Sequence, residues 1–316
     1  MARGIVCALA GGVCWGFSGT CAQLLMNDYG APAEWITCVR MVIAAVFFLF
    51  LTAVRDWRDL VAVFRDRRSL VQIALFAVFG VLLTQMSYLN AIRYTSAGVG
   101  TTIEQIGLVL IMLYVCVRAR RLPRVREALG LACALGGMLL IATQGDPSAL
   151  SLPLPGLVWG IANGLSVAFY IMYPKKLFAE WGSFAVTGIG MFIGGIVAAA
   201  VYFGGVALGE PLALPALDAA GAAVFAAFVL VGTFAAFALY LHGVSVVGSV
   251  QGSLLGAVEP VSATLFATLW LGTAFTGADL AGCALMIAMI FLVTGEKPNV
   301  RQDGAQVVEE SHSAKS

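Results

Sequence analysis

Charged residues are scarce in this chain. Lysine, arginine, aspartate and glutamate together make up 11% of its 316 residues, 60% are hydrophobic, and the mean hydropathy is +0.94. One water-soluble core cannot enclose so many apolar side chains. The composition therefore predicts a protein that crosses a membrane many times and excludes an ordinary soluble domain.

Residue types that carry catalysis or bind metals are also few. There are only two histidines, His242 and His312, and the seven cysteines form no CxxC pair and no Cys/His cluster. An intramembrane enzyme would need a His/Asp cluster, a Ser/His pair or metal-ligand spacing at one depth. No Walker-type glycine loop points to an ATP-driven pump. We therefore expect no enzymatic activity, no cofactor and no metal.

Long apolar runs are what the sequence has in abundance. A bilayer core of ~30 Å requires roughly 20 residues of helix, and unbroken apolar runs differ from the alternating pattern of barrel strands. The first run follows Met1-Ala2-Arg3 and exceeds the length of a signal-peptide core, so we expect it to be retained. Ten spans are predicted, over residues 4–26, 34–54, 70–92, 95–117, 128–144, 156–174, 183–204, 218–241, 247–270 and 277–294.

A shift of 152 residues lays the second half of the chain over the first. In one ungapped register, identical residues of the two halves meet at Gly4, Gly12, Phe17, Ala74, Phe76, Gly80, Tyr88, Leu89, Gly100 and Gly130. Because each half holds an odd number of spans, the two copies must lie upside down relative to each other, as in many secondary transporters. The predicted fold is an all-α membrane protein of ten transmembrane helices in two inverted five-helix repeats. These repeats are residues 4–144 and 156–294, and a disordered cytoplasmic tail follows over residues 295–316.

Basic residues give the expected orientation. In a ten-span arrangement every lysine and arginine except Arg40 and Arg93 falls on one side, and basic residues concentrate on the cytoplasmic side of membrane proteins. We therefore predict a multi-pass protein of the cytoplasmic membrane with both termini cytoplasmic. The arginine-rich loops lack interleaved aromatic residues, so a nucleic-acid partner is not expected.

Several short motifs resemble those of the drug/metabolite transporter superfamily, in its EamA group. They are Gly-Gly-Val-Cys-Trp15-Gly, Cys-Val-Arg40-Met, Asn90-Ala-Ile-Arg93-Tyr-Thr-Ser-Ala and Glu259-Pro260-Val. The resemblance covers about residues 4–294 and includes the YddG-type amino acid exporters of that group. It implies a ten-helix carrier of small metabolites. In the matching element of the first repeat, Leu108 stands where members of the family usually have proline. Whether the fourth helix has a kink equal to that of the ninth is therefore left open.

Four ionisable residues stand out in or beside the predicted spans: Arg40, Glu104, Glu259 and, at the end of the eighth span, His242, for which an interfacial role is expected. Such residues cost ~2.5–3.5 kcal/mol on insertion scales and mark functional sites. Arg40 and Glu104 have matching depths, so an ion pair, carboxylate binding by Arg40 and proton binding by Glu104 remain open. Glu259 precedes Pro260, which lacks an N–H. A coupling or substrate role for Glu259 and bracing of the helix break both remain open.

Uncharged polar residues fall on coherent helix faces near the middle of the membrane. Thr101, Glu104 and Gln105 share one face of the fourth helix, and Asn163, Ser166 and Tyr170 share one face of the sixth. Any one of these residues can make a hydrogen bond between two helices, but the set as a whole suits the binding of a small amphipathic ligand. The candidate substrate-binding residues are Trp15, Ser18, Gln85, Tyr88, Thr101, Gln105, Asn163, Ser166, Tyr170 and Gln251.

The sequence therefore predicts a secondary transporter that moves small amphipathic metabolites, amino acids or related compounds, by alternating access, with protons as a candidate coupling ion. A carrier of phosphorylated sugars or nucleotide sugars is the alternative, although dianionic cargo favours several buried bases. An intramembrane enzyme or a receptor without cargo is a second alternative. A receptor would leave Glu104 and Glu259 unexplained.

Overall fold

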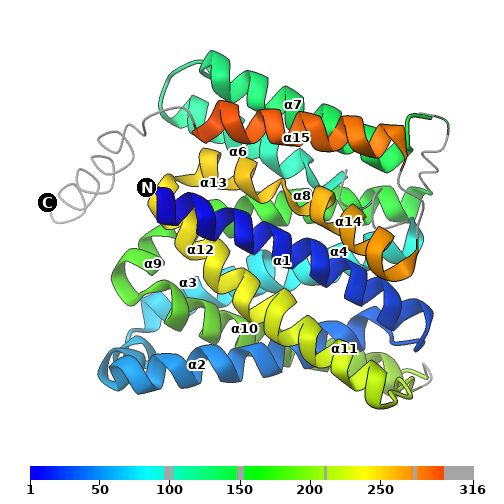
Figure 1. Ribbon diagram of the computed structural model, residues 1–316. Coiled ribbons are helices and arrows are strands. Elements are labelled where there is room, and N and C mark those ends of the chain that lie inside the picture. Colours follow the sequence, from blue (N-terminus) through cyan, green and yellow to red (C-terminus); the bar gives the residue numbers. More distant parts are fainter. Residues whose placement is uncertain are drawn as a thin grey trace, which may run out of the picture.

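The chain folds as a bundle of helices. The structure is a computed structural model that describes residues 1–95, 100, 103–146, 148, 153–209, 212–272 and 276–294. Within these ranges every regular element is helical, and the helices lie side by side as long rods (Figure 1). The all-α prediction is confirmed, whereas the predicted tail over 295–316 lies outside the described residues.

Eight helical segments are long and apolar enough to cross a membrane. Two shorter apolar helices, α6 (Ile106–Arg118) and α15 (Gly277–Thr294), stand where two further spans were predicted, so the count of ten stays a prediction. The helices that make up the eight segments are α1 (Ala2–Asn27), α2 (Ala33–Arg65), α3 (Arg67–Leu75) with η1 (Phe76–Leu82) and α4 (Leu83–Tyr94), α7 (Val125–Thr143), α8 (Leu154–Met172) with α9 (Lys175–Trp181), α10 (Ser183–Ala207), α11 (Ala219–Val229) with η3 (Leu230–Ala235) and α12 (Ala236–Val247), and α13 (Ser249–Gly256) with α14 (Glu259–Leu271).

The second helix is longer than predicted. We expected it to end at residue 54, but α2 continues to Arg65. Residues 55–65 contain neither proline nor glycine, so nothing stops the helix where its composition turns polar. The apolar stretch of α2 ends near Arg55, and the remaining turns are an amphipathic extension of the same helix.

The helices pack in the pairs that an internal repeat requires. α1 packs along α12 and α14, and its equivalent α8 packs along α4 and α6. α2 pairs with α10, and α7 pairs with α15; the members of each pair are repeat equivalents. Figure 1 shows α7 ending and α15 beginning at the same end of the bundle, so these two equivalents are antiparallel.

Glycines allow the two repeats to touch at equivalent places. A Cβ atom added to Gly12 would lie 2.9 Å from the carbonyl oxygen of Gly256, and one added to Gly164 would lie 3.0 Å from the carbonyl oxygen of Glu104. These two contacts are related by the 152-residue shift. Small residues permit such close approach in membranes, where lipid gives no hydrophobic drive for helices to associate. The repeat therefore extends from the sequence to the packing.

Two of the ten predicted spans, the fourth and the ninth, are interrupted halfway, again at equivalent positions. The ninth span breaks at Ala257 and Val258, and Pro260 then lies in the first turn of α14, where its missing N–H removes no helical bond. The fourth span breaks at Gln105, where the N–H of Leu108 donates to the Gln105 carbonyl oxygen at 3.0 Å. The fourth helix is therefore broken in the same place although it carries no proline there.

Aspartates cap α3 and α11, the helices that begin the predicted third and eighth spans. Asp66 accepts hydrogen bonds from Ser69 before α3, and its repeat equivalent Asp218 accepts one from the N–H of Gly221 before α11. The hydrogen bond from the Ser69 hydroxyl lowers the pKa of Asp66, and the Gly221 N–H lowers the pKa of Asp218. Both caps are therefore ionised at neutral pH, and each negative charge interacts favourably with the positive N-terminal end of its helix dipole.

Candidate functional site

A cavity lies in the core of the bundle, between the two repeats. The space open to the centre of a water-sized sphere is about 70 Å³, so in this conformation there is room for a few small groups. Both interrupted spans contribute to its wall. The predicted site residues that line it are Trp15, Ser18, Arg40, Gln85, Tyr88, Glu104, Gln105, Tyr170 and Glu259.

The lining follows the internal repeat. Equivalent positions face the cavity from both halves: Trp15 and Val167, Ser18 and Tyr170, Gln85 and Phe237, Tyr88 and Tyr240, Glu104 and Gly256, Gln105 and Ala257. The first repeat supplies most of the polar members of these pairs, and the second supplies mainly aromatic or small ones. The cavity is therefore symmetric in position and asymmetric in chemistry.

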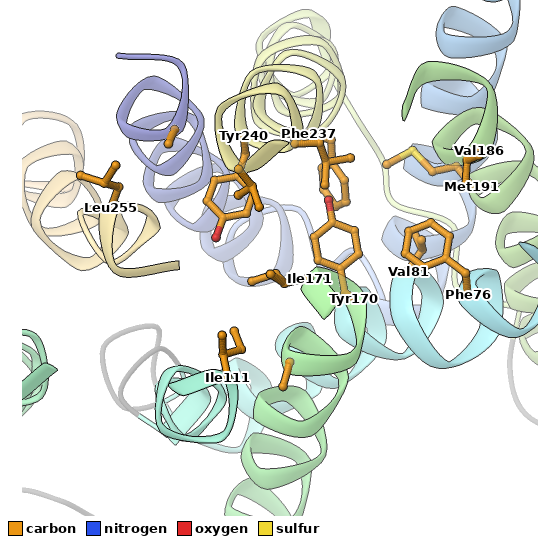
Figure 2. Close-up of a cluster of buried hydrophobic side chains, with 14 of the residues drawn as sticks. Phe76, Val81, Ile111, Tyr170, Ile171, Val186, Met191, Phe237, Tyr240 and Leu255 are labelled. Carbon is orange, nitrogen blue, oxygen red and sulfur yellow. The ribbon is translucent and has the colours of Figure 1, made fainter. Parts of the chain in front are cut away.

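The second repeat provides most of the aromatic wall. The Trp15 ring of α1 lies 4.4 Å from that of Tyr240 and 5.4 Å from that of Phe237, measured between centroids. The Tyr170 ring lies 5.5 Å from that of Phe237. Figure 2 shows Phe237 and Tyr240 of α12 opposite Tyr170 and Ile171 of α8. Such a wall offers a ligand apolar surface and stacking partners.

Glu259 is held by a hydrogen bond that crosses between the repeats. Glu259 is the first residue of α14, directly after the break, and it is 8% exposed. The Tyr88 hydroxyl on α4 donates to Glu259 Oε1 at 3.3 Å. Glu104 lines the same cavity and lies close enough for the two carboxyl groups to interact electrostatically. The break thus brings two acids to one small space.

Arg40 faces these acids without pairing with either. It is 2% exposed, and its guanidinium lies over the Phe228 ring, 5.0 Å from the centroid. Among the described residues, its Nε and Nη2 have no hydrogen-bond partner and no acid lies within ion-pair distance. The ion-pair alternative for Arg40 and Glu104 is therefore not what the described residues show.

Three predicted site residues lie away from the cavity wall. Asn163 Nδ2 donates to the Thr84 carbonyl oxygen at 3.4 Å, and Thr84 Oγ1 donates to Ser166 Oγ at 3.0 Å. These bonds join α8 to α4, so Asn163 and Ser166 act as helix–helix contacts. Gln251 is half-buried on α13 and does not line the cavity. Thr101 lies outside the described residues.

The sequence-based prediction missed several lining residues. Tyr240 is the repeat equivalent of Tyr88, so the repeat itself held the signal that would have found it. Thr84, one turn from Tyr88 on α4, also carried a polar signal. Phe237 and Leu108 carried none, because an apolar residue in an apolar helix does not reveal which way it faces.

No metal centre was found in the part of the chain that the structure describes: no group of three or more His, Cys, Asp or Glu side chains is close enough to hold an ion. His242, predicted to lie near the end of the eighth span, is exposed on α12 and does not line the cavity.

Comparison with known proteins agrees with this architecture. The model of the EamA-like transporter family matches twice, over residues 2–143 and 154–295. The uncharacterized inner membrane transporter YicL of Salmonella typhimurium strain LT2 is 28% identical over 294 residues, which cover 92% of this chain and 95% of that protein. A solved crystal structure superposes with a TM-score of 0.77 at 15% identity, covering 93% of this chain and 97% of its own, and that likeness concerns the fold alone.

Proposed function

Because this chain belongs to the EamA-like transporter family and is thus a membrane transporter, we propose that it carries small amphipathic metabolites, amino acids or related compounds, by alternating access. The observation that carries the proposal is the cavity between the repeats, which combines an aromatic wall with one base and two acids. Pockets that are mostly apolar with a few placed polar groups hold small ligands of this kind. The likeness to YddG-type amino acid exporters stays a prediction.

The charges of the cavity argue against the alternative cargo. Among the described lining residues, Arg40 is the one base, and Glu104 and Glu259 are acids. A phosphate ester carries two negative charges, and its recognition favours several arginines or lysines. A zwitterion or neutral metabolite meets less repulsion here. Glu104 and Glu259 are the candidate proton-binding groups of this proposal, should transport be coupled to protons.

The proposed arrangement in the membrane has ten spans. In it, α6 and α15 also cross the bilayer, which local thinning or flanking residues accommodate at modest cost. The two repeats are inverted, the protein resides in the cytoplasmic membrane, and both termini are cytoplasmic. The antiparallel α7 and α15 support the inversion, and the bias of lysine and arginine supports the orientation.

Counterflow in proteoliposomes tests the cargo class. We expect exchange of one or more zwitterionic amino acids, and we expect Tyr88→Ala to slow it by about 10-fold, since the change removes a wall and the hydrogen bond to Glu259. Tyr114→Ala is the matched control, because Tyr114 is 54% exposed on α6 and does not line the cavity. Robust counterflow of a sugar phosphate without a response to any amino acid would replace this proposal with the alternative.

A further inference from the structure

Arg40 is a buried cation whose counter-charge is missing from the described part of the chain. Two of its three guanidinium nitrogens, Nε and Nη2, are enclosed and make no hydrogen bond there. The guanidinium carbon lies over the Phe228 ring, 5.0 Å from its centroid. Charged groups are retained in a membrane interior where a partner balances them. A partner can reach Arg40 through the cavity that it lines.

The other charges of the cavity restrict what that partner can be. Glu259 is engaged by Tyr88, and Glu104 has neither a hydrogen bond nor an ion pair with the described residues. An anion without a positive group would satisfy Arg40, but it would leave both acids without a partner and would be repelled by either acid in its ionised form. A cation alone would satisfy the acids and leave Arg40 unpaired. A small molecule that carries both a carboxylate and an ammonium group meets both requirements.

We propose that Arg40 binds the carboxylate of a zwitterionic ligand, while Glu259 and Glu104 face its ammonium group and the aromatic wall takes its side chain. This assignment rests on the proposed function and adds the residue that selects the ligand class. Arginine suits the role because its planar fork matches both oxygens of a carboxylate. Phe228 of α11 packs against the guanidinium from the other side of the repeat boundary.

The test compares ligands that differ in one charge. Counterflow is measured with an amino acid that the protein exchanges and with its methyl ester and amide, which keep the side chain and ammonium group but lack the carboxylate. The wild type should prefer the acid by about 10- to 100-fold. The preference should fall close to 1 in Arg40→Gln and remain partial in Arg40→Lys. Because the readout is a ratio within each variant, it does not depend on how much protein folds.

Arg93→Gln is the matched control. Arg93 lies at the end of α4, is 56% exposed in its side chain and pairs with Glu34 at 3.8 Å, away from the cavity wall. Its loss should leave the acid preference unchanged. Equal exchange of acid, ester and amide by the wild type would overturn the role of Arg40 while leaving an amino acid carrier. Absence of exchange with every ligand of the series would instead count against the proposed function.

An independent observation concerns two hydrogen bonds at opposite ends of the bundle. The Tyr29 hydroxyl, between α1 and α2, donates to Oδ1 of the helix cap Asp218 at 3.1 Å. At the other end, Trp181 Nε1, in the last residue of α9, donates to Ser69 Oγ at 2.9 Å, and Ser69 in turn donates to the cap Asp66. Figure 1 shows α9 and α3 at the end where the N-terminus lies, opposite the start of α11.

These two contacts are repeat equivalents. A shift of 152 residues takes Tyr29 to Trp181 and Asp66 to Asp218. Each contact joins the two repeats: the first-repeat tyrosine donates directly to a second-repeat cap, and the second-repeat tryptophan reaches a first-repeat cap through Ser69. Both are formed in this conformation, in which the cavity is small.

We infer that these contacts are the two closures of the transport cycle, one at each membrane face, and that opening of either end breaks one and keeps the other. The inference rests on alternating access. It requires that weakening each contact shift the conformational balance in opposite directions, since the relative populations follow the difference in stability of the two open states.

Sided labelling of a cavity residue measures that balance without transport. Ser253→Cys places a reporter in the lining, and a membrane-impermeant thiol reagent is applied from one side, with the labelling of the chain lacking the reporter subtracted. Tyr29→Phe should raise labelling from the Tyr29 end several-fold and lower it from the other, and Trp181→Phe should do the reverse. Tyr202→Phe is the control, because Tyr202 bonds Ala213 within the second repeat. Changes of the same sign in both variants, or none, would overturn the inference.

Discussion

At the scale of single residues, glycine determines how closely the two repeats pack. A Cβ atom on Gly16 of α1 would lie 2.6 Å from the backbone N of Ala263 and 2.6 Å from the carbonyl oxygen of Glu259 in α14. Backbone atoms cannot move aside as a flexible side chain can. The contact therefore fixes α1 against the break that carries Glu259.

Gly16→Ala is expected to lower the free energy of unfolding by about 1–3 kcal/mol, the usual cost of overpacking. Gly204→Ala is the control, because nothing lies within 4 Å of a Cβ atom added there, and alanine in a helix is if anything more stable than glycine. Thermal unfolding in detergent, followed by circular dichroism, measures both. If the Gly16→Ala protein unfolds at the same temperature as the wild type, α1 and α14 are free to separate at this point.

The sequence predicted individual site residues where a polar side chain interrupts an apolar helix. Arg40, Glu104 and Glu259 could be found in this way because burying charge in a membrane has a large cost that requires an explanation. The partners could not be found, because depth along a helix does not give the direction in which a side chain points. Arg40 and Glu104 match in depth and still do not pair among the described residues, whereas Tyr88 reaches Glu259 across the repeat boundary.

At the scale of elements, apolar runs located the spans better than their ends and breaks. Membrane-spanning helices can be predicted because a run of roughly 20 apolar residues matches the thickness of the bilayer core and rarely adopts another structure. The extension of α2 to Arg65 was missed because helix propensity continues after hydrophobicity ends. The break at Gln105 could not be predicted because no proline lies near it in the sequence. It lies in close contact with α8, where the carbonyl oxygen of Glu104 lies against Gly164, and tertiary contacts of this kind leave no local signal in the sequence.

At the scale of the whole molecule, the orientation in the membrane can be tested with exposed engineered cysteines. Asp28→Cys and Leu212→Cys lie at the end of the bundle that carries the Tyr29–Asp218 contact, and we expect an impermeant thiol reagent added outside cells to label them. Trp57→Cys and Leu122→Cys, on the arginine-rich side, should be labelled only after the membrane is opened. Labelling of Leu122→Cys in intact cells would contradict the inverted-repeat arrangement proposed for the membrane.

The unequal chemistry of the two repeats has a directional consequence. In a carrier with identical halves, a rotation that exchanges the repeats would also exchange its outward-open and inward-open forms, and a ligand would meet the same vestibule from either side. Here position 40 is arginine and its equivalent 192 is phenylalanine, while Glu259 corresponds to Gly107. Exchange of the two repeats would therefore not reproduce the same cavity, because the positions equivalent to Arg40 and Glu259 carry no charge. The two membrane faces of one carrier can in this way differ in affinity for the same molecule.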